Sequence, residues 1–122
     1  MTRIYLAGKM SGLPDFNYPA FRAEAVRLRA LGYTVENPAD NPEPACGTWL
    51  GYMRTAVAQL ATCDAIALLD GWQDSRGACV ERTLADGLGL PVLRAKDITE
   101  AEDVGKPGSV IVAVGVEMVG AQ

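Results

Sequence analysis

The 122-residue chain contains no histidine. Without histidine, neither a Ser-His-Asp triad nor a Cys-His pair can supply a nucleophile, and the commonest zinc ligand is missing. Any catalysis would therefore depend on carboxylates, hydroxyl groups, lysine, arginine or backbone amides. We expect no metal ion and no cofactor in this protein.

Cysteine is also scarce in this sequence. Cys46, Cys63 and Cys79 are an odd number of residues without a C-x-x-C pair, which argues against a disulfide scaffold. The chain has no apolar run long enough to span a membrane, and its first residues lead into a strand pattern rather than a signal peptide. These absences predict a soluble, cytoplasmic protein that does not bind membranes.

Positive charge is not concentrated in any part of the chain. The formal net charge is −4, and no basic stripe is present that would bind the backbone of a nucleic acid polymer. Hydrophobic residues make up 49% and charged residues 21% of the chain, an ordinary globular balance. The length is that of one domain, which we expect over residues 1–122.

Apolar, strand-like runs alternate with segments of helical period, a pattern typical of βαβ units on a parallel sheet. We expect strands at residues 4–7, 33–36, 65–69, 91–93 and 109–116. Helices are expected from the N-cap Asn17 to before Gly32, with Pro19 in the first turn, and at 48–61 and 75–88. The continuous apolar run at 65–69 predicts a central strand that is covered on both faces.

Two further segments complete this prediction of the fold. Residues 37–47 contain three prolines and are expected to form an irregular loop outside the core. Residues 97–100 have the form of a capping box, which predicts a short helix after them. In the helix at 48–61, core packing is expected from Trp49, Met53, Ala56, Val57 and Leu60.

The helix at 75–88 carries one residue that does not suit its buried side. Its inner stripe consists of Gly77, Ala78, Glu81, Leu84, Ala85 and Leu88. A carboxylate in such a stripe costs several kcal/mol unless it is paired or faces a cavity. Since helical side chains lean toward the N-terminus, Glu81 points toward Gly77, which leaves space. This pattern predicts a carboxylate at the back of a pocket beyond the end of a central strand. Alternatively, Glu81 is stabilised by the helix dipole and turns out to solvent.

Two nearby segments offer groups for ligand binding. Ser75 precedes the helix and either caps it or forms an anion site with the amides of Gly77 and Ala78. The loop at 8–12 follows the first strand but matches neither the phosphate-binding P-loop nor the G-x-G-x-x-G pattern. Taken alone, this loop is only a weak indication of a ligand.

Several short segments, in this order, resemble the nucleoside 2-deoxyribosyltransferase superfamily, most of all its small phage and bacterial members of unassigned function. They are IYLAG at 4–8, MSG at 10–12, CDAI at 63–66 and SRG at 75–77, followed by Glu81. The resemblance covers roughly residues 3–95. It implies a flavodoxin-like three-layer sandwich with a five-stranded parallel sheet in the order 2-1-3-4-5. It also implies cleavage of the N-glycosidic bond of a (deoxy)nucleoside or nucleoside 5′-monophosphate, by hydrolysis or base transfer.

The resemblance also implies roles for individual residues. Glu81 matches the glutamate that attacks the anomeric carbon, which divides a difficult substitution into two easier steps. Tyr5 matches a tyrosine near the same pocket. Ser75 matches a position that contacts phosphate in the nucleotide-hydrolysing branch, which favours a monophosphate substrate. Active sites of this superfamily are completed by a neighbouring subunit, so a homodimer or higher homo-oligomer is expected.

One departure from the superfamily concerns the second helix. Related enzymes carry an aspartate eight residues before the position of Asp64, where this chain has Ala56. Asp70, Asp74 and Asp40 are the candidates to replace that acid. Residues after Lys96 match nothing in the superfamily, so the contribution of a partner subunit cannot be carried over.

The catalytic candidates are therefore Glu81, Tyr5 and Asp70. The candidate substrate-binding residues are Gly8, Lys9, Met10, Ser11, Gly12, Trp72, Asp74, Ser75 and Gly77. Trp72 could stack on a base or serve as a packing contact. Three readings of the function stay open: an N-glycosidic enzyme, a module that binds a nucleotide or sugar phosphate without cleaving it, and a structural domain with an empty cleft. Glu81 favours the first of these and Ala56 the second.

Overall fold

Four parallel strands form the centre of the protein in the computed structural model, which describes residues 2–104. They are β1 (Arg3–Ala7), β2 (Thr34–Glu36), β3 (Ala65–Leu68) and β4 (Val92–Arg94). Their order is β2-β1-β3-β4, as predicted for a flavodoxin-like sheet. The fifth strand, expected at 109–116, lies outside the described residues.

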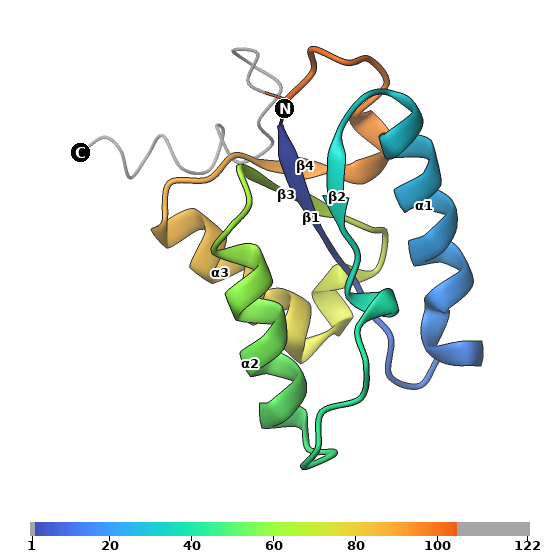
Figure 1. Cartoon of the computed structure of the whole chain (residues 1–122), viewed down its shortest axis with the longest axis vertical. Coiled ribbons are helices and arrows are strands. Elements are labelled where there is room, and N and C mark those ends of the chain that lie inside the picture. The colour runs from blue at the N-terminus through green and yellow to red at the C-terminus, as the bar shows by residue number, and fades with distance from the viewer. Residues whose placement is uncertain (1, 105–122) are drawn as a thin grey trace.

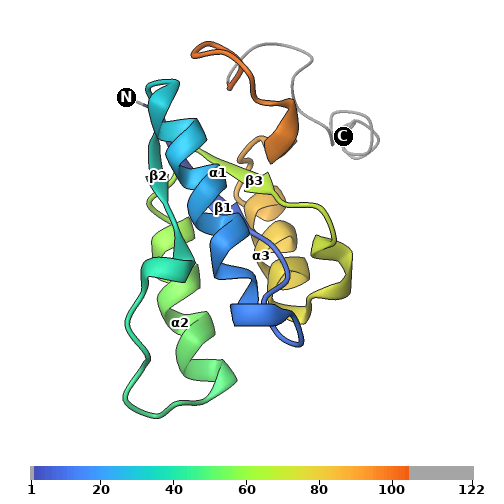
Figure 2. The same cartoon turned by 90° about the vertical axis from the view of Figure 1, so that its right-hand side faces the viewer.

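Helices cover both faces of this sheet, which gives the expected three layers (Figure 1). Helix α1 (Tyr18–Ala30) lies on one face, and α2 (Trp49–Leu60) and α3 (Arg76–Gly87) lie on the other (Figure 2). Because successive strand residues point to opposite faces, Ile4 and Leu6 pack with α1 in one core cluster. Tyr5 and Ala7 pack with α2 and α3 in the other cluster. The strand period thus places Tyr5 on the face that also receives Glu81.

Local sequence determines where the helices begin and end. Thr48 caps α2 by accepting a hydrogen bond from the Gly51 amide, and Ser75 caps α3 by accepting one from the Ala78 amide at 3.1 Å. Helix α1 ends just before Gly32, whose φ of 106° is accessible mainly to glycine. Among the described residues, no helix combines the length and apolar character needed to cross a membrane.

The loop after β2 departs from the prediction that it lies outside the core. Asn37 and Ala39 are both buried, and Ala39 belongs to the α1-side cluster. The Asn37 side chain accepts a hydrogen bond from the Ala39 amide at 3.1 Å, which folds a short 3₁₀ helix, η2 (Pro38–Asp40), against α1. A local side-chain turn therefore brings part of this proline-rich segment into the core.

Two predictions about the C-terminal part of the chain were wrong. Leu88 is 53% exposed because α3 ends at Gly87, so position 88 leaves the buried stripe. No helix follows Asp97 within the described residues, because its carboxylate pairs with Arg94 at 2.8 Å instead of capping a helix. The chain forms a turn there, in which the Asp103 carboxylate accepts hydrogen bonds from backbone amides.

Candidate functional site

A cavity of about 490 Å³ lies beyond the carboxyl end of β1, between α1 and the first turns of α2 and α3. Its lining includes the loop after β1 and the residues that open α3. Ligands of open α/β sheets bind at this end of the strands, so the location agrees with the sequence-based expectation.

Glu81 lies at the buried side of this cavity and is 6% exposed. The Tyr5 hydroxyl donates a hydrogen bond to Glu81 Oε2 at 2.7 Å. Gly77 also lines the cavity and packs closely against α2, because an added Cβ there would lie 3.1 Å from Met53 Sδ. The alternative in which Glu81 turns out to solvent is wrong, because burial and the Tyr5 hydroxyl hold the carboxylate inside.

Burial changes the protonation of both partners. It raises the pKa of Glu81 from 4.5 to about 7, although the hydrogen bond from Tyr5 acts to lower it. Burial, together with the charge of Glu81, raises the pKa of Tyr5 well above 10. Tyr5 is therefore a hydrogen-bond donor at neutral pH, and Glu81 can adopt either its acid form or its carboxylate form there.

The amino end of α3 brings polar and cationic groups to the same cavity. Ser75 Oγ accepts a hydrogen bond from the Ala78 amide and thus caps the helix. The first-turn amides of Arg76 and Gly77 have no acceptor within the helix itself. The Arg76 guanidinium lies over the Trp49 ring, 3.8 Å from its centroid, and Lys9 also lines the cavity. Together these groups are suited to an anionic ligand.

Aromatic side chains from α2 and from the segment before α1 form the mouth of the cavity, and they were not selected from the sequence as site residues. Phe16 is 59% exposed, and Trp49 and Tyr52 are also exposed although all three line the cavity. Trp49 was assigned to the core because it falls on the apolar stripe of α2. In the structure, Trp49 lies in the first turn of α2, one turn from Tyr52, and both are exposed. The spacing of these two aromatic residues at the start of a helix is the sequence signal that could have indicated a binding surface.

An unusual backbone segment positions Phe16. Asp15, Phe16 and Asn17 have φ values of 51°, 52° and 60°, a left-handed conformation that costs non-glycine residues on the order of 1–3 kcal/mol each. The expected capping of α1 by the Asn17 side chain is absent; Asn17 Nδ2 instead donates to the Lys9 carbonyl at 3.1 Å. This hydrogen bond joins the two loops that border the cavity.

The cavity brings together most of the residues selected from the sequence. It is lined by Tyr5, Gly8, Lys9, Met10, Ser11, Asp74, Ser75, Gly77 and Glu81. Ala56 also lines it and is buried, so the position of the missing aspartate does face the site.

Three selected residues do not line the cavity, contrary to expectation. Asp70 is mostly exposed because the chain turns toward the end of β4 after β3, and its carboxylate lies 3.5 Å from Lys96 Nζ. Trp72 packs against the core cluster of α2 and α3 and lies beneath Arg82. Gly12 occupies an exposed turn with a φ of 82°.

Only one of the three candidates for the missing acid lies in the cavity. Asp74 lines it, whereas Asp70 pairs with Lys96 outside it. Asp40 also lies elsewhere, with Oδ1 3.5 Å from Arg22 Nε. Within the residues described, no group of three or more histidine, cysteine, aspartate or glutamate side chains is arranged to hold a metal ion.

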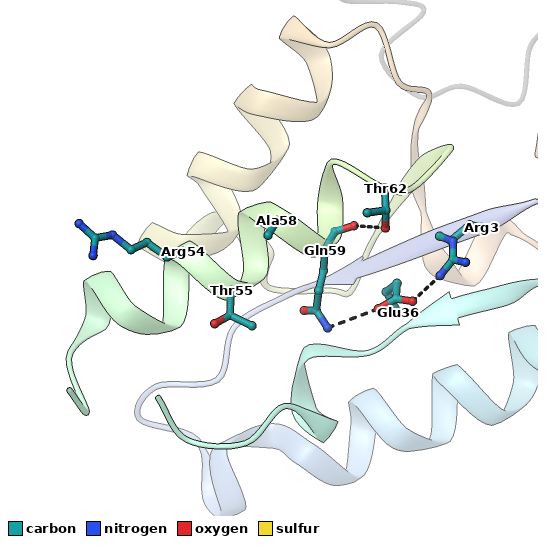
Figure 3. Close-up of a pocket in the computed structure, with 7 residues that line it drawn as sticks. All are labelled: Arg3, Glu36, Arg54, Thr55, Ala58, Gln59 and Thr62. Carbon is teal, nitrogen blue, oxygen red and sulfur yellow. Dashed lines mark hydrogen bonds and ion pairs between the residues drawn. The ribbon is translucent and has the colours of Figure 1, made fainter. Parts of the chain in front are cut away.

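A second, polar hollow of about 670 Å³ lies between β2 and the outer side of α2 (Figure 3). Its lining includes Arg3, Glu36, Gln59 and Thr62. The Arg3 guanidinium pairs with Glu36 Oε2 at 2.5 Å, and Gln59 Nε2 donates to Glu36 Oε1 at 3.4 Å. This hollow contains none of the residues selected for the site.

Comparison with known proteins supports the fold and identifies the family. A solved structure described as a 2-deoxyribosyltransferase from the psychrotolerant bacterium Bacillus psychrosaccharolyticus is similar, with a TM-score of 0.62 and 24% sequence identity. The similarity covers 76% of this chain and 71% of that chain, and confirms the expected resemblance at the level of the fold. No curated protein matches the sequence. A family model described as a domain of unknown function (DUF4406) matches residues 2–94, so the chain belongs to that family.

Proposed function

We propose that this protein cleaves the N-glycosidic bond of a (deoxy)nucleoside or nucleoside 5′-monophosphate, with Glu81 as the nucleophile. The observation that carries this proposal is the buried Glu81 carboxylate, held by Tyr5 at the back of an open cavity. The similarity in fold to a 2-deoxyribosyltransferase supports the same reaction class.

The proposed reaction proceeds in two displacements. A carboxylate oxygen of ionised Glu81 forms a bond to the anomeric carbon as the bond from that carbon to the base nitrogen breaks, and the base leaves with the bonding electrons. Water or a second base then attacks the same carbon, which releases the Glu81 carboxylate, and the proton lost by this attacking group balances the proton taken up by the departed base. Tyr5 donates to Oε2 and thereby fixes the rotation of the carboxylate throughout.

The proposed mechanism lacks an obvious general acid to protonate the leaving base. Ala56 occupies the position where an acid is expected, and Asp74 is the remaining candidate that lines the cavity. A general acid contributes typically about 10²- to 10⁴-fold in rate, so we expect slow cleavage by the native protein. For the same reason, a module that binds a nucleotide without cleaving it is the second candidate function.

We also propose that the substrate is anionic and that the protein self-associates. A 5′-phosphate would be held at the amino end of α3 by backbone amides, the Ser75 region and the cations Arg76 and Lys9. A homodimer or higher homo-oligomer would cover the exposed aromatic mouth that contains Phe16 and Trp49.

Substitution of Glu81 by Gln should reduce cleavage by roughly 10³-fold or more, because the amide cannot act as the nucleophile. Release of free base from 2′-deoxynucleosides and their 5′-monophosphates, followed by chromatography, measures this. Asp86→Asn, on the same helix but outside the cavity lining, is the matched control and should retain native activity. Equal activity in Glu81→Gln would contradict the nucleophile assignment. Binding without any base release by the native protein would favour the binding module.

The pH dependence of stability tests the environment of Glu81 without a substrate. Because its pKa is about 7 in the folded protein and about 4.5 when unfolded, the folded state binds more protons between these values. The free energy of unfolding should therefore fall as pH rises from about 4.5 to about 7, by on the order of 3 kcal/mol from this group. In urea unfolding at pH 5 and pH 8, Glu81→Gln should lack this decrease. An identical pH dependence in both proteins would contradict the buried carboxylate.

Ala56→Asp should increase base release by roughly 10²-fold, because it places a carboxyl group at the position where related enzymes carry an aspartate. Ala58→Asp lies two residues further along α2 on its exposed side and should leave the rate unchanged. Robust turnover by the native protein that also survives Asp74→Asn would show that no acid is missing.

Arg76→Gln should weaken binding of a deoxynucleoside 5′-monophosphate by about 10-fold while the affinity for the nucleoside changes little, because only the phosphate interacts with the guanidinium. Titration calorimetry with both ligands measures this selectivity. Arg82 is on the same helix but lies over Trp72 outside the cavity. Arg82→Gln should therefore preserve the preference for the monophosphate. If the native protein binds both ligands equally well, the phosphate site is wrong.

A further inference from the structure

A chain of polar side chains leads from the outer hollow to the cavity. Arg3 pairs with Glu36, and Glu36 accepts a hydrogen bond from Gln59, as Figure 3 shows. Gln59 in turn forms two reciprocal hydrogen bonds with Asn41: Asn41 Nδ2 donates to Gln59 Oε1, and Gln59 Nε2 donates to Asn41 Oδ1, both at 2.7 Å. Asn41 lines the cavity that contains Glu81. The chain thus connects a surface ion pair to the wall of the candidate active site.

The charged end of this chain determines the orientation of both amides. An ionised carboxylate only accepts hydrogen bonds, so the Gln59 group that faces Glu36 must be its NH₂. This leaves Gln59 Oε1 facing the Asn41 NH₂, and the reversed orientation of Asn41 would place oxygen against oxygen. Arg3 holds the Glu36 carboxylate in place at 2.5 Å. The orientation of Asn41 therefore follows from the charge of Glu36, two hydrogen bonds away.

Asn41 keeps hydrogen-bonding capacity after it has paired with Gln59. An asparagine amide has two N–H donors and two acceptor lone pairs, and the reciprocal pair uses one of each. The remaining donor and acceptor belong to a residue that lines the cavity. Side-chain amides of this kind distinguish nucleobases by the donors and acceptors on their edges.

We propose that Asn41 is a specificity-determining residue that recognises the hydrogen-bonding edge of the nucleobase, and that Gln59 and Glu36 are positioning residues for its amide. This inference rests on the proposed function, because it requires a nucleoside or nucleotide in the cavity. The ligand class is a base with an exocyclic amino or oxo group. Asn41 fixes which of these two groups is preferred.

Two pairs of ligands that differ mainly in this group provide the test. 2′-Deoxyadenosine and 2′-deoxyinosine form one pair, and 2′-deoxycytidine and 2′-deoxyuridine the other; in each pair the amino base donates where the oxo base accepts. Their affinities for the native protein and for Asn41→Asp are measured by titration calorimetry. The new carboxylate only accepts, so the ratio of amino-base to oxo-base affinity should increase about 10-fold or more in at least one pair.

Gln59→Leu tests the positioning role separately and remains informative if Asn41→Asp does not fold. Without Gln59, the Asn41 amide can adopt either orientation, so the ratio of amino-base to oxo-base affinity should move toward one. Thr55→Val is the matched control: Thr55 lies one turn earlier on the same wall of the outer hollow (Figure 3), and its hydroxyl bonds only weakly, at 3.4 Å, to the Gly51 carbonyl. This control should keep the native ratio.

The outcomes separate this inference from the proposed function. If the native protein binds none of the four nucleosides or their monophosphates, the proposed function fails and this inference with it. If it binds them but Asn41→Asp and Gln59→Leu leave the ratio unchanged, only this inference is overturned. A uniform loss of affinity for all four ligands in Gln59→Leu would likewise overturn it, because the amide pair would then only fasten the loop after β2 to α2.

Discussion

The hydrogen bond between Tyr5 and Glu81 is the interaction on which the rest of the site depends. A carboxylate placed among the apolar side chains of α2, α3 and the sheet loses most of its hydration, and the raised pKa of Glu81 reflects this cost. Tyr5 offsets part of it with a single donor at 2.7 Å. Because β1 lies between β2 and β3, the Tyr5 hydroxyl is held by an inner strand of the sheet.

Small residues around this pair provide the space for a ligand. Gly77 and Ala56 line the cavity from two different helices, and neither has a side chain large enough to fill it. Gly8 serves a different purpose, since an added Cβ there would lie 2.9 Å from the Leu69 side chain and 3.2 Å from the Phe21 ring. The loop after β1 can therefore pass close to the core only with glycine at this position. The cavity therefore depends on the small size of these residues as well as on the polar groups that line it.

The sequence predicted the parts of the structure that follow from local periodicity. The 3.6-residue period identified Glu81 as a carboxylate on a buried face, and the apolar run at 65–69 correctly indicated a central strand. Tyr5 could not be found in this way, because one tyrosine within an apolar strand has no periodic signature. It entered only through a resemblance to a known family.

The predictions that were wrong or missing concern where a side chain points after a turn and which distant residue it contacts, and local sequence patterns do not determine either. Asp70 follows the central strand as closely as a site residue should, but the turn after β3 directs it toward Lys96. The pairing of Asn41 with Gln59 joins a loop to a helix 18 residues away. No spacing rule predicts such a contact, since either amide alone is compatible with an exposed surface.

The separation of the two central residues along the chain has a consequence for how the protein folds. Tyr5 and Glu81 are 76 residues apart, and β1 pairs with β3 only after most of the chain between them has been traversed. Contacts of such long range close late, because the entropy of a large loop must be lost before they form. A growing chain that has emerged only as far as α2 thus has no binding site at all. The cavity that contains Glu81 therefore forms only when α3, the last α-helix of the described residues, docks on the sheet.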